Sequence, residues 1–180
     1  VTIDATKKFP EEQVNDTSHP KDGYENLYEV LSRKHIGLYD FNTNLLKKGI
    51  SVLLVSIDKT QGVLVKTIIK QIIGDVEGQL PKFVAVVDKE MKLNDMSLLT
   101  WYLSANIDSE RDCYFTEKGG TQFPCFVFDG TRKCYATDNF SRDWPAVVVS
   151  SSETIEMVDK KWSNLSIKEF IESPSKRFLY

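Results

Sequence analysis

Apolar residues between positions 50 and 115 gather into short unbroken runs that are separated by amphipathic segments. ISVLLVSI at residues 50–57 and FVAVVD at residues 83–88 are such runs, and CYF at residues 113–115 is a shorter one. Unbroken apolar runs of this length are typical of strands covered on both faces, as in parallel sheets. Their spacing of about 30 residues predicts β-α-β units with right-handed crossovers.

The segments between these apolar runs show the spacing of apolar residues that is typical of helices. One apolar stripe follows Gly62, at positions 64, 65, 68, 69, 72 and 73, and ends at Gly74 and Gly78. Asn94 is a candidate N-cap for a second helix, whose apolar face carries Met96, Leu99, Tyr102 and Leu103. A third helix is predicted from about Tyr24 to near Gly37, and a loop is predicted over residues 42–49.

The C-terminal third is less regular. CFVF at residues 125–128 and AVVV at residues 146–149 predict strands, and capping boxes at Ser150 and Ser166 predict two helices. The sequence therefore predicts an α/β fold: a three-layer, mostly parallel sheet with flanking helices and additional short strands in the C-terminal third. We expect an N-terminal segment over residues 1–45 and an α/β domain over residues 46–180.

Composition narrows the functional classes. The chain of 180 residues is 41% hydrophobic and 27% charged, which is ordinary for a soluble domain. A net charge of −3 argues against nucleic-acid binding, and no apolar run approaches the roughly 18 residues of a transmembrane span. The three cysteines are interpreted as reduced thiols, so a cytoplasmic location is expected. His19 and His35 are too few for a metal site.

The ends of the predicted parallel strands are where open α/β sheets place ligands. The loop after the first strand, residues 58–62, holds a single glycine, so it lacks both the dinucleotide fingerprint and the phosphate-binding loop. Asp58 and Asp88 follow two strands and have two interpretations. They can bind Mg²⁺ or act as acid and base, or they can cap the turns that follow the strands, which we favour.

The segment DGTRK at residues 129–133 brings together the most side chains that could bind a ligand. Asp129 and Thr131 predict an Asx-type turn, after which Arg132 and Lys133 would project together and hold a carboxylate or phosphate. The alternative is a surface turn whose cations pair with neighbouring acids. IDATKK at residues 3–8 repeats the phrase, which makes Asp4, Thr6 and Lys8 equivalent candidates for an anion or interface site.

These phrases together resemble a known family. Val55 to Lys59, KFVAVVDKEMKLND, WYLSANIDSERD and DGTRK follow in the order seen in the C-terminal domain of UbiD-type decarboxylases, which act on aromatic acids. DGTRK resembles the family's D-A-T-x-K motif with Gly130 in place of alanine, and Ser109 stands where the family usually has proline. The resemblance covers about residues 50 to 165.

The resemblance implies that this chain is a non-catalytic piece of a carboxy-lyase acting on a (polyprenyl) hydroxybenzoate-type acid in ubiquinone or menaquinone biosynthesis. Prenylated FMN and Mn²⁺ are expected in upstream domains and none in this chain, which by itself should be inactive. The implied roles are assembly into a homo-oligomer and packing against the upstream domains. The loop over residues 116–124 would face the substrate, through Gly120, Phe123 and Pro124.

Two questions stay open at this point. The repeat of D-[AG]-T-[KR]-K, each copy followed by a helix about 20 residues later, suggests a tandem duplication in which residues 1–45 are the tail of a preceding related unit. The alternative function is a stand-alone α/β module for oligomerisation or for binding a small anion.

Overall fold

A computed structural model describes residues 23–117, 123–141, 144, 148–166, 169–173 and 175–176. The helices are α1 (Glu25–Ser32), α2 (Asn44–Lys47), α3 (Val65–Gly74), α4 (Met96–Asn106), α5 (Tyr135–Asp138) and α6 (Ser152–Lys161), with 3-10 turns at Lys59–Gln61 and Trp162–Asn164. The strands are β1 (Leu38–Asn42), β2 (Val52–Ile57), β3 (Phe83–Asp88), β4 (Cys113–Phe115) and β5 (Phe126–Asp129).

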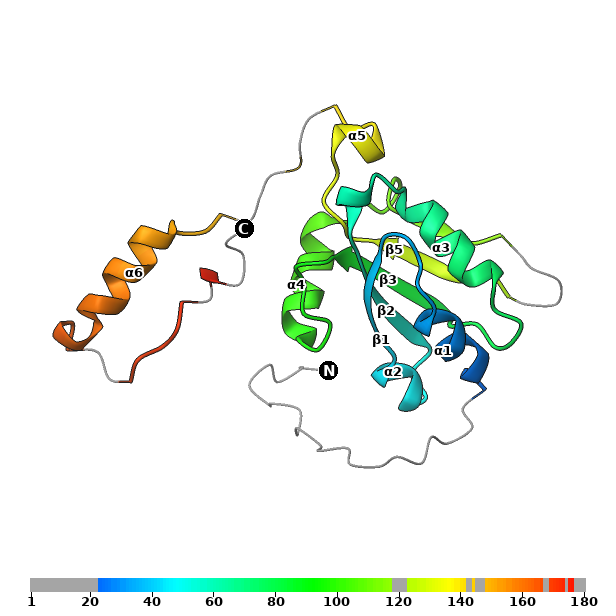
Figure 1. The fold of residues 1–180 in the computed structure, drawn as a ribbon, viewed down its shortest axis with the longest axis horizontal. Coiled ribbons are helices and arrows are strands. Elements are labelled where there is room, and N and C mark those ends of the chain that lie inside the picture. Colours follow the sequence, from blue (N-terminus) through cyan, green and yellow to red (C-terminus); the bar gives the residue numbers. More distant parts are fainter. Residues whose placement is uncertain are drawn as a thin grey trace.

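The strands form one five-stranded sheet in the order β1-β2-β3-β5-β4 (Figure 1). Strands β2, β3 and β5 are parallel, and the two edge strands, β1 and β4, are antiparallel to their neighbours. The carboxyl ends of β2, β3 and β5 therefore meet at one edge of the sheet, where Ile57, Asp88 and Asp129 lie. The prediction of an α/β fold with a mostly parallel sheet is confirmed.

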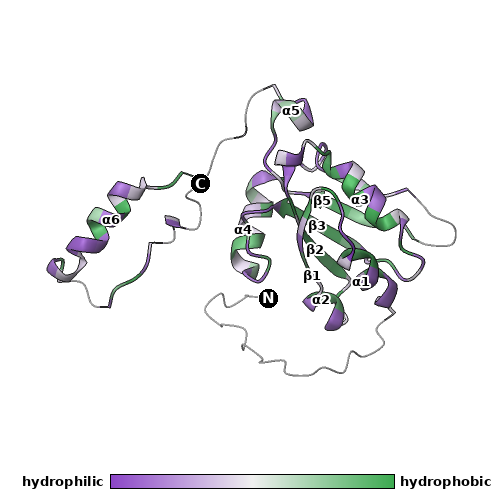
Figure 2. Cartoon of the chain, viewed as in Figure 1, coloured by the Kyte–Doolittle hydropathy of each residue, from purple (hydrophilic) through white to green (hydrophobic). Residues whose placement is uncertain are grey.

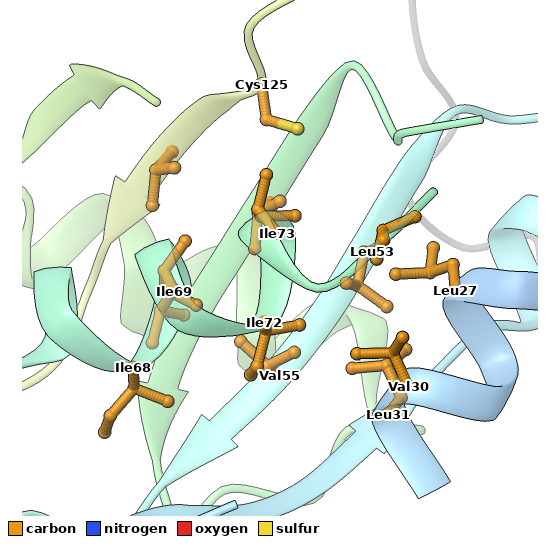
Figure 3. Close-up of a cluster of buried hydrophobic side chains, with 14 of the residues drawn as sticks. Leu27, Val30, Leu31, Leu53, Val55, Ile68, Ile69, Ile72, Ile73 and Cys125 are labelled. Carbon is orange, nitrogen blue, oxygen red and sulfur yellow. The ribbon is translucent and has the colours of Figure 1, made fainter. Parts of the chain in front are cut away.

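Alternation along the central strands produces a core on each face of the sheet. On one face, α1 and α3 pack on alternate residues of β2, β3 and β5; this core includes Leu27, Val30, Leu31, Leu53, Val55, Ile68, Ile69, Ile72, Val84, Val86 and Val127 (Figure 3). On the other face, α4 packs on the remaining residues, which include Leu54, Ala85, Val87, Leu99 and Tyr102. Figure 2 shows the matching hydropathy pattern, with apolar strands and an α3 that is polar on its outer side.

The amphipathic stripe on α3 explains why it covers the sheet so completely. Its five buried positions recur at helical spacing and are all β-branched: Val65, Ile68, Ile69, Ile72 and Ile73. Burying four isoleucines and a valine against the sheet contributes on the order of 1.5–3 kcal/mol for each side chain. This packing is the main reason that a helix rich in β-branched residues forms here, because tertiary contacts override its modest intrinsic helix propensity.

Helix α6 stands apart from the sheet in Figure 1. Among the described residues, the two core clusters contain no side chain from α6, and Ile155 is its only buried residue. Trp162 packs edge-on against Phe170, and Lys176 pairs with Asp159 at 2.8 Å, so the described C-terminal residues gather around this helix.

Several local predictions differ from the structure. The predicted loop over residues 42–49 contains the end of β1 and helix α2, and β4 is antiparallel to β5 rather than part of a β-α-β unit. The cap of α4 is Asp95, which accepts from the Leu98 amide, and the cap of α6 is Ser151, so both predictions were one residue early. Residues 148–149 form no strand, and 169–173 form no helix.

Residues 23–45 belong to the same body as the rest of the sheet, because α1 contributes to the core and β1 pairs with β2. The repeated phrase at residues 3–8, with Asp4, Thr6 and Lys8, lies outside the described residues. The duplication therefore stays a prediction. A helix does follow each copy, but α1 packs on the sheet whereas α6 does not.

Candidate functional site

The carboxyl edge of the sheet gathers most of the buried charge of the described residues. Asp88 and Asp129 end two adjacent parallel strands, and the DGTRK segment follows the second of them. Asp129 accepts from the amide of Thr131 at 3.1 Å and from its hydroxyl at 2.6 Å, so the predicted Asx-type turn is confirmed. After this turn, Arg132 lies near Asp88 at the end of β3, whereas Lys133 lies near Asp112 just before β4.

Lys133 points into the protein. Its side chain is 2% exposed, and Nζ lies 3.0 Å from Oδ1 of Asp129 and 3.5 Å from Oδ1 of Asp112. The ammonium also donates to the Asp129 carbonyl at 3.0 Å. The charge is therefore compensated by two carboxylates and a carbonyl, as a buried ammonium requires. The anion-holding role of Lys133 stays a prediction, and an incoming anion would have to compete with these carboxylates.

Arg132 lies beside the end of β3. Its amide donates to Oδ2 of Asp88 at 2.8 Å, and its Nε is 3.8 Å from the same oxygen. The hydroxyl of Tyr102 donates to this oxygen at 2.6 Å. Burial raises the pKa of the Asp88 carboxyl, and these hydrogen bonds and the guanidinium offset part of that effect. Asp88 thus fastens α4 and the DGTRK segment to the sheet.

Asp58 has the capping role that the sequence favoured. It is the N-cap of the 3-10 turn, where it accepts from the amide and hydroxyl of Thr60, and it pairs with Lys89 at 3.1 Å. The hydrogen bond from the Thr60 hydroxyl is the main reason that the pKa of Asp58 is lowered. Across the described residues, no group of three or more His, Cys, Asp or Glu side chains could hold a metal ion.

Four charged residues, described next, complete the network, although sequence reasoning had not given them a role at this edge. Lys59 donates to Asp138 at 2.6 Å and to the Arg132 carbonyl at 2.7 Å, and Arg111 forms two hydrogen bonds to Asp112. In the sequence, Lys59 and Asp112 stood out only as members of the segments that resemble the family, residues 55–59 and 101–112. A clue to Lys59 was its place directly after a parallel strand, next to Asp58.

The opposite, amino edge of the sheet is apolar and aromatic. Phe83 and Phe126 begin adjacent strands, and Phe115 ends β4 beside them; the Phe115 and Phe126 rings are 4.7 Å apart. Phe83 stacks on Phe128 at 6.0 Å. Phe83 and Phe115, which both pack on Phe126, are 41% and 67% exposed. We call Phe83, Phe115, Phe126 and Phe128 the aromatic edge.

The predicted substrate-side loop ends at this same edge. Phe123 is 88% exposed, and with Pro124 it lines a pocket of about 330 Å³ that also includes Leu80 and Pro81. Gly120 lies outside the described residues. The structure thus separates two surfaces. The DGTRK charges lie at the carboxyl edge, whereas Phe123 and Pro124, at the described end of the loop, lie with the aromatic edge at the amino end of the sheet.

These features define an α/β domain whose buried charges are internally paired and whose exposed apolar surface lies at the amino edge of the sheet. The model of the 3-octaprenyl-4-hydroxybenzoate carboxy-lyase C-terminal domain matches residues 26–129. This chain belongs to that family, the C-terminal domains of UbiD-type carboxy-lyases, as the sequence predicted.

Solved structures and relatives agree with this assignment. The chain shares its fold with the vanillic acid decarboxylase of Sedimentibacter hydroxybenzoicus, with a TM-score of 0.58 to the closed form and 0.53 to the open form, at 14% identity in both cases. The match covers 77% of this chain and 31% of that one. An uncharacterised protein of Archaeoglobus fulgidus is 26% identical over 147 residues, which is 76% of this chain and 30% of the relative. The chain therefore spans about a third of the proteins it resembles.

Proposed function

We propose that this chain is the C-terminal region of a UbiD-type decarboxylase, and that it supports catalysis without supplying catalytic residues. The observation behind the proposal is the family match over residues 26–129 together with a fold shared with about a third of a vanillic acid decarboxylase. The parent's substrate would be an aromatic acid of the hydroxybenzoate type, used in quinone biosynthesis. The assignment to the cytoplasm is part of the same proposal. In the described part of the chain, no helix is long and apolar enough to cross a membrane.

The contacts at the carboxyl edge of the sheet support placing the cofactors of the parent enzyme elsewhere. The turn after β2 is closed by Asp58, which would repel a flavin phosphate, and the other carboxylates of the carboxyl edge are engaged by Lys59, Lys133 and Arg132. We therefore assign prenylated FMN and Mn²⁺ to upstream parts of the parent polypeptide and derive no chemical step from this chain.

The first supporting role is packing against the upstream domains. The aromatic edge and Phe123 form an exposed apolar surface next to the substrate-side loop, and such surfaces commonly mark an interface. The test is Phe123→Ala in the parent enzyme. Because the ring is 88% exposed, folding should be unaffected while kcat/KM for the aromatic acid falls. Tyr39→Ala is the matched control, since Tyr39 is 63% exposed on β1 at the other side of the sheet.

The outcomes are distinct. Loss of activity in the Phe123 variant alone, with an unchanged melting temperature, supports the substrate-side assignment. Unchanged activity in both variants would contradict it. Uptake of prenylated FMN by the isolated chain, detected as a flavin absorption band after gel filtration, would contradict the assignment of the cofactor to upstream domains.

The second supporting role is assembly. Helix α6 exposes Met157 and Val158 at 48% and 40%, and Phe170 and Ile171 beside it are 55% and 67% exposed. An amphipathic helix that adds no described side chain to the two core clusters of the sheet is suited to contact another subunit. Light scattering on the isolated chain should show a concentration-dependent oligomer, which Val158→Lys should weaken. A strict monomer at high concentration would contradict this role.

A further inference from the structure

A groove runs between α3 and the edge strand β4. Its volume is about 590 Å³, within the range of small-molecule sites. It lies on the face of the sheet that α1 and α3 cover, beyond the part of that face filled by the core. Its lining residues come from α3, from the segment that follows α3, and from β4 and the two residues after it.

The floor and one wall of the groove are apolar. Ile73, Val76 and Leu80 supply aliphatic surface, and Tyr114 supplies aromatic surface from β4. The ring of Phe115 turns to the opposite face of the sheet, where it packs on Phe126. An apolar body placed here would gain roughly 25 cal/mol for each Å² of apolar surface removed from water.

Two lysines line the other side. Lys66 and Lys70 are four residues apart on α3, so they project on the same face of the helix. The Lys66 ammonium lies 5.0 Å from the centre of the Tyr114 ring, and no described carboxylate pairs with it. Lys70 pairs with Glu117 at 3.0 Å, but both side chains are at least 70% exposed, so water and salt weaken that pair.

The net charge of the groove is therefore positive, opposite in sign to the net charge of the whole chain. Its charged lining residues are two lysines and one glutamate, whereas the whole chain carries a net charge of −3.

We propose that this groove binds an amphipathic carboxylate, with an apolar body on Ile73, Val76 and Leu80 and its anionic head between Lys66 and Lys70. The lysines act as flexible point charges and do not impose the bidentate geometry of an arginine. The proposal does not depend on the parent's enzymatic activity. It also differs from the anion site predicted at Arg132 and Lys133, since those cations already lie beside carboxylates.

The first experiment titrates three probes into the ¹⁵N-labelled chain and follows amide chemical shifts. Octanoate has both the tail and the anion, acetate has only the anion, and 1-octanol has only the tail. We expect saturable shifts for the amides around Lys66, Lys70 and Phe115 with octanoate, and binding at least about tenfold weaker with acetate and with 1-octanol. Equal binding of octanoate and either control probe, or no saturable shift at these amides, would overturn the proposal.

Variants then test the assigned contacts. Lys66→Gln and Lys70→Gln should each weaken octanoate binding by about two- to fivefold, the range expected for an exposed ion pair. Glu117→Gln should tighten it, because it frees Lys70. Lys48→Gln, an exposed lysine at the end of α2, is the matched control and should change nothing. Lysine variants that bind octanoate as well as the unchanged chain would overturn the placement of the head group.

A steric variant tests the tail site separately. Gly74 lines the groove, and a Cβ placed there meets no atom within 4 Å, so a side chain can begin at this position without a clash and extend into the groove. Gly74→Leu should reduce octanoate affinity while the melting temperature stays the same or rises. Unchanged affinity in a folded Gly74→Leu variant would overturn the assignment of the apolar body to this groove.

Discussion

Lys133 and Asp112 meet inside the protein although they approach from different connections. Asp112 precedes the edge strand β4, and Lys133 follows β5; their Nζ and Oδ1 atoms are 3.5 Å apart, and both side chains are at most 3% exposed. Asp129 holds the same ammonium at 3.0 Å. One lysine thus compensates two carboxylates and ties the segment after β5 to the turn before β4.

Removing this ammonium should be strongly destabilising. Lys133→Met keeps the apolar stem of the side chain but leaves Asp129 buried without its cation and leaves Asp112 with Arg111 alone. We expect a loss of about 3–5 kcal/mol in the free energy of unfolding, measured by urea denaturation. Lys59→Met is a useful comparison, because its partner Asp138 is more exposed and also accepts from Thr137 and the Cys134 amide. A loss below 1 kcal/mol in Lys133→Met would contradict this role.

The pH dependence of stability should have opposite signs for two carboxylates of this edge. Burial alone would raise the pKa of Asp112, but the hydrogen bonds from Arg111 and the Asp108 amide, with the charge of Lys133, lower it below the ordinary 3.8. Its contribution to stability is therefore present above pH 3.8 and is lost as the pH falls through the folded-state value. Burial raises the pKa of Asp88, so its contribution is lost as the pH rises from 3.8 through the folded-state value.

Two asparagine variants separate these effects. Asp112→Asn should lower the free energy of unfolding at pH 7 and reduce the loss of stability on acidification. Asp88→Asn should cost less at pH 7 than at pH 3, because it removes a carboxylate that is costly to ionise in its buried position. Urea unfolding of each variant between pH 3 and pH 7 measures both slopes. Equal slopes in the two variants would show that the two carboxylates do not titrate in opposite directions.

The sequence predicted the parts of the fold that depend on local apolar patterning. The unbroken apolar runs at β2 and β3 predict strands that are covered on both faces. The apolar stripe of α3 is regular enough to predict which side of this helix faces the sheet. Helix α4 was harder to delimit, since Asn94 and Asp95 are adjacent capping residues and only the structure shows that Asp95 accepts from Leu98. Strand β1 was missed because its burial is only partial along its length.

The charged edge shows what local patterning cannot supply. The turn at Asp129 and Thr131 was predictable, because both partners lie within three residues. The direction of Lys133 was not, because it depends on Asp112, which is brought there by the antiparallel pairing of β4 with β5. Trp144 likewise meets a residue that is distant in the sequence, because the Arg111 guanidinium lies 5.3 Å from its ring centre.

The surroundings of Gly130 explain why this chain has glycine where the family's D-A-T-x-K motif has alanine. A Cβ at this position would lie 2.6 Å from Cδ2 of Leu103 on α4 and 3.2 Å from the carbonyl oxygen of Val86. Gly130→Ala should therefore cost about 1–3 kcal/mol in the free energy of unfolding, the range for overpacking. In a Leu103→Ala background the same substitution should cost less, because only the 3.2 Å approach to the Val86 carbonyl oxygen remains tight. Thermal or urea unfolding of the four proteins in this cycle measures the coupling, and equal costs in both backgrounds would contradict it.

Helix α6 should be dispensable for folding and necessary for self-association. Both core clusters of the described residues lie between Tyr24 and Val127, so a chain that ends at residue 147 keeps every core side chain. We expect its melting temperature to remain within about 3 °C of the full chain, since a loss of 1 kcal/mol already moves a domain of this size by about 2–4 °C. Light scattering should show the shortened chain as a monomer at concentrations where the full chain associates. A fall of 10 °C or more would mean that α6 stabilises its own sheet, and persistent association would place the subunit contact elsewhere, with the aromatic edge as the next surface to test.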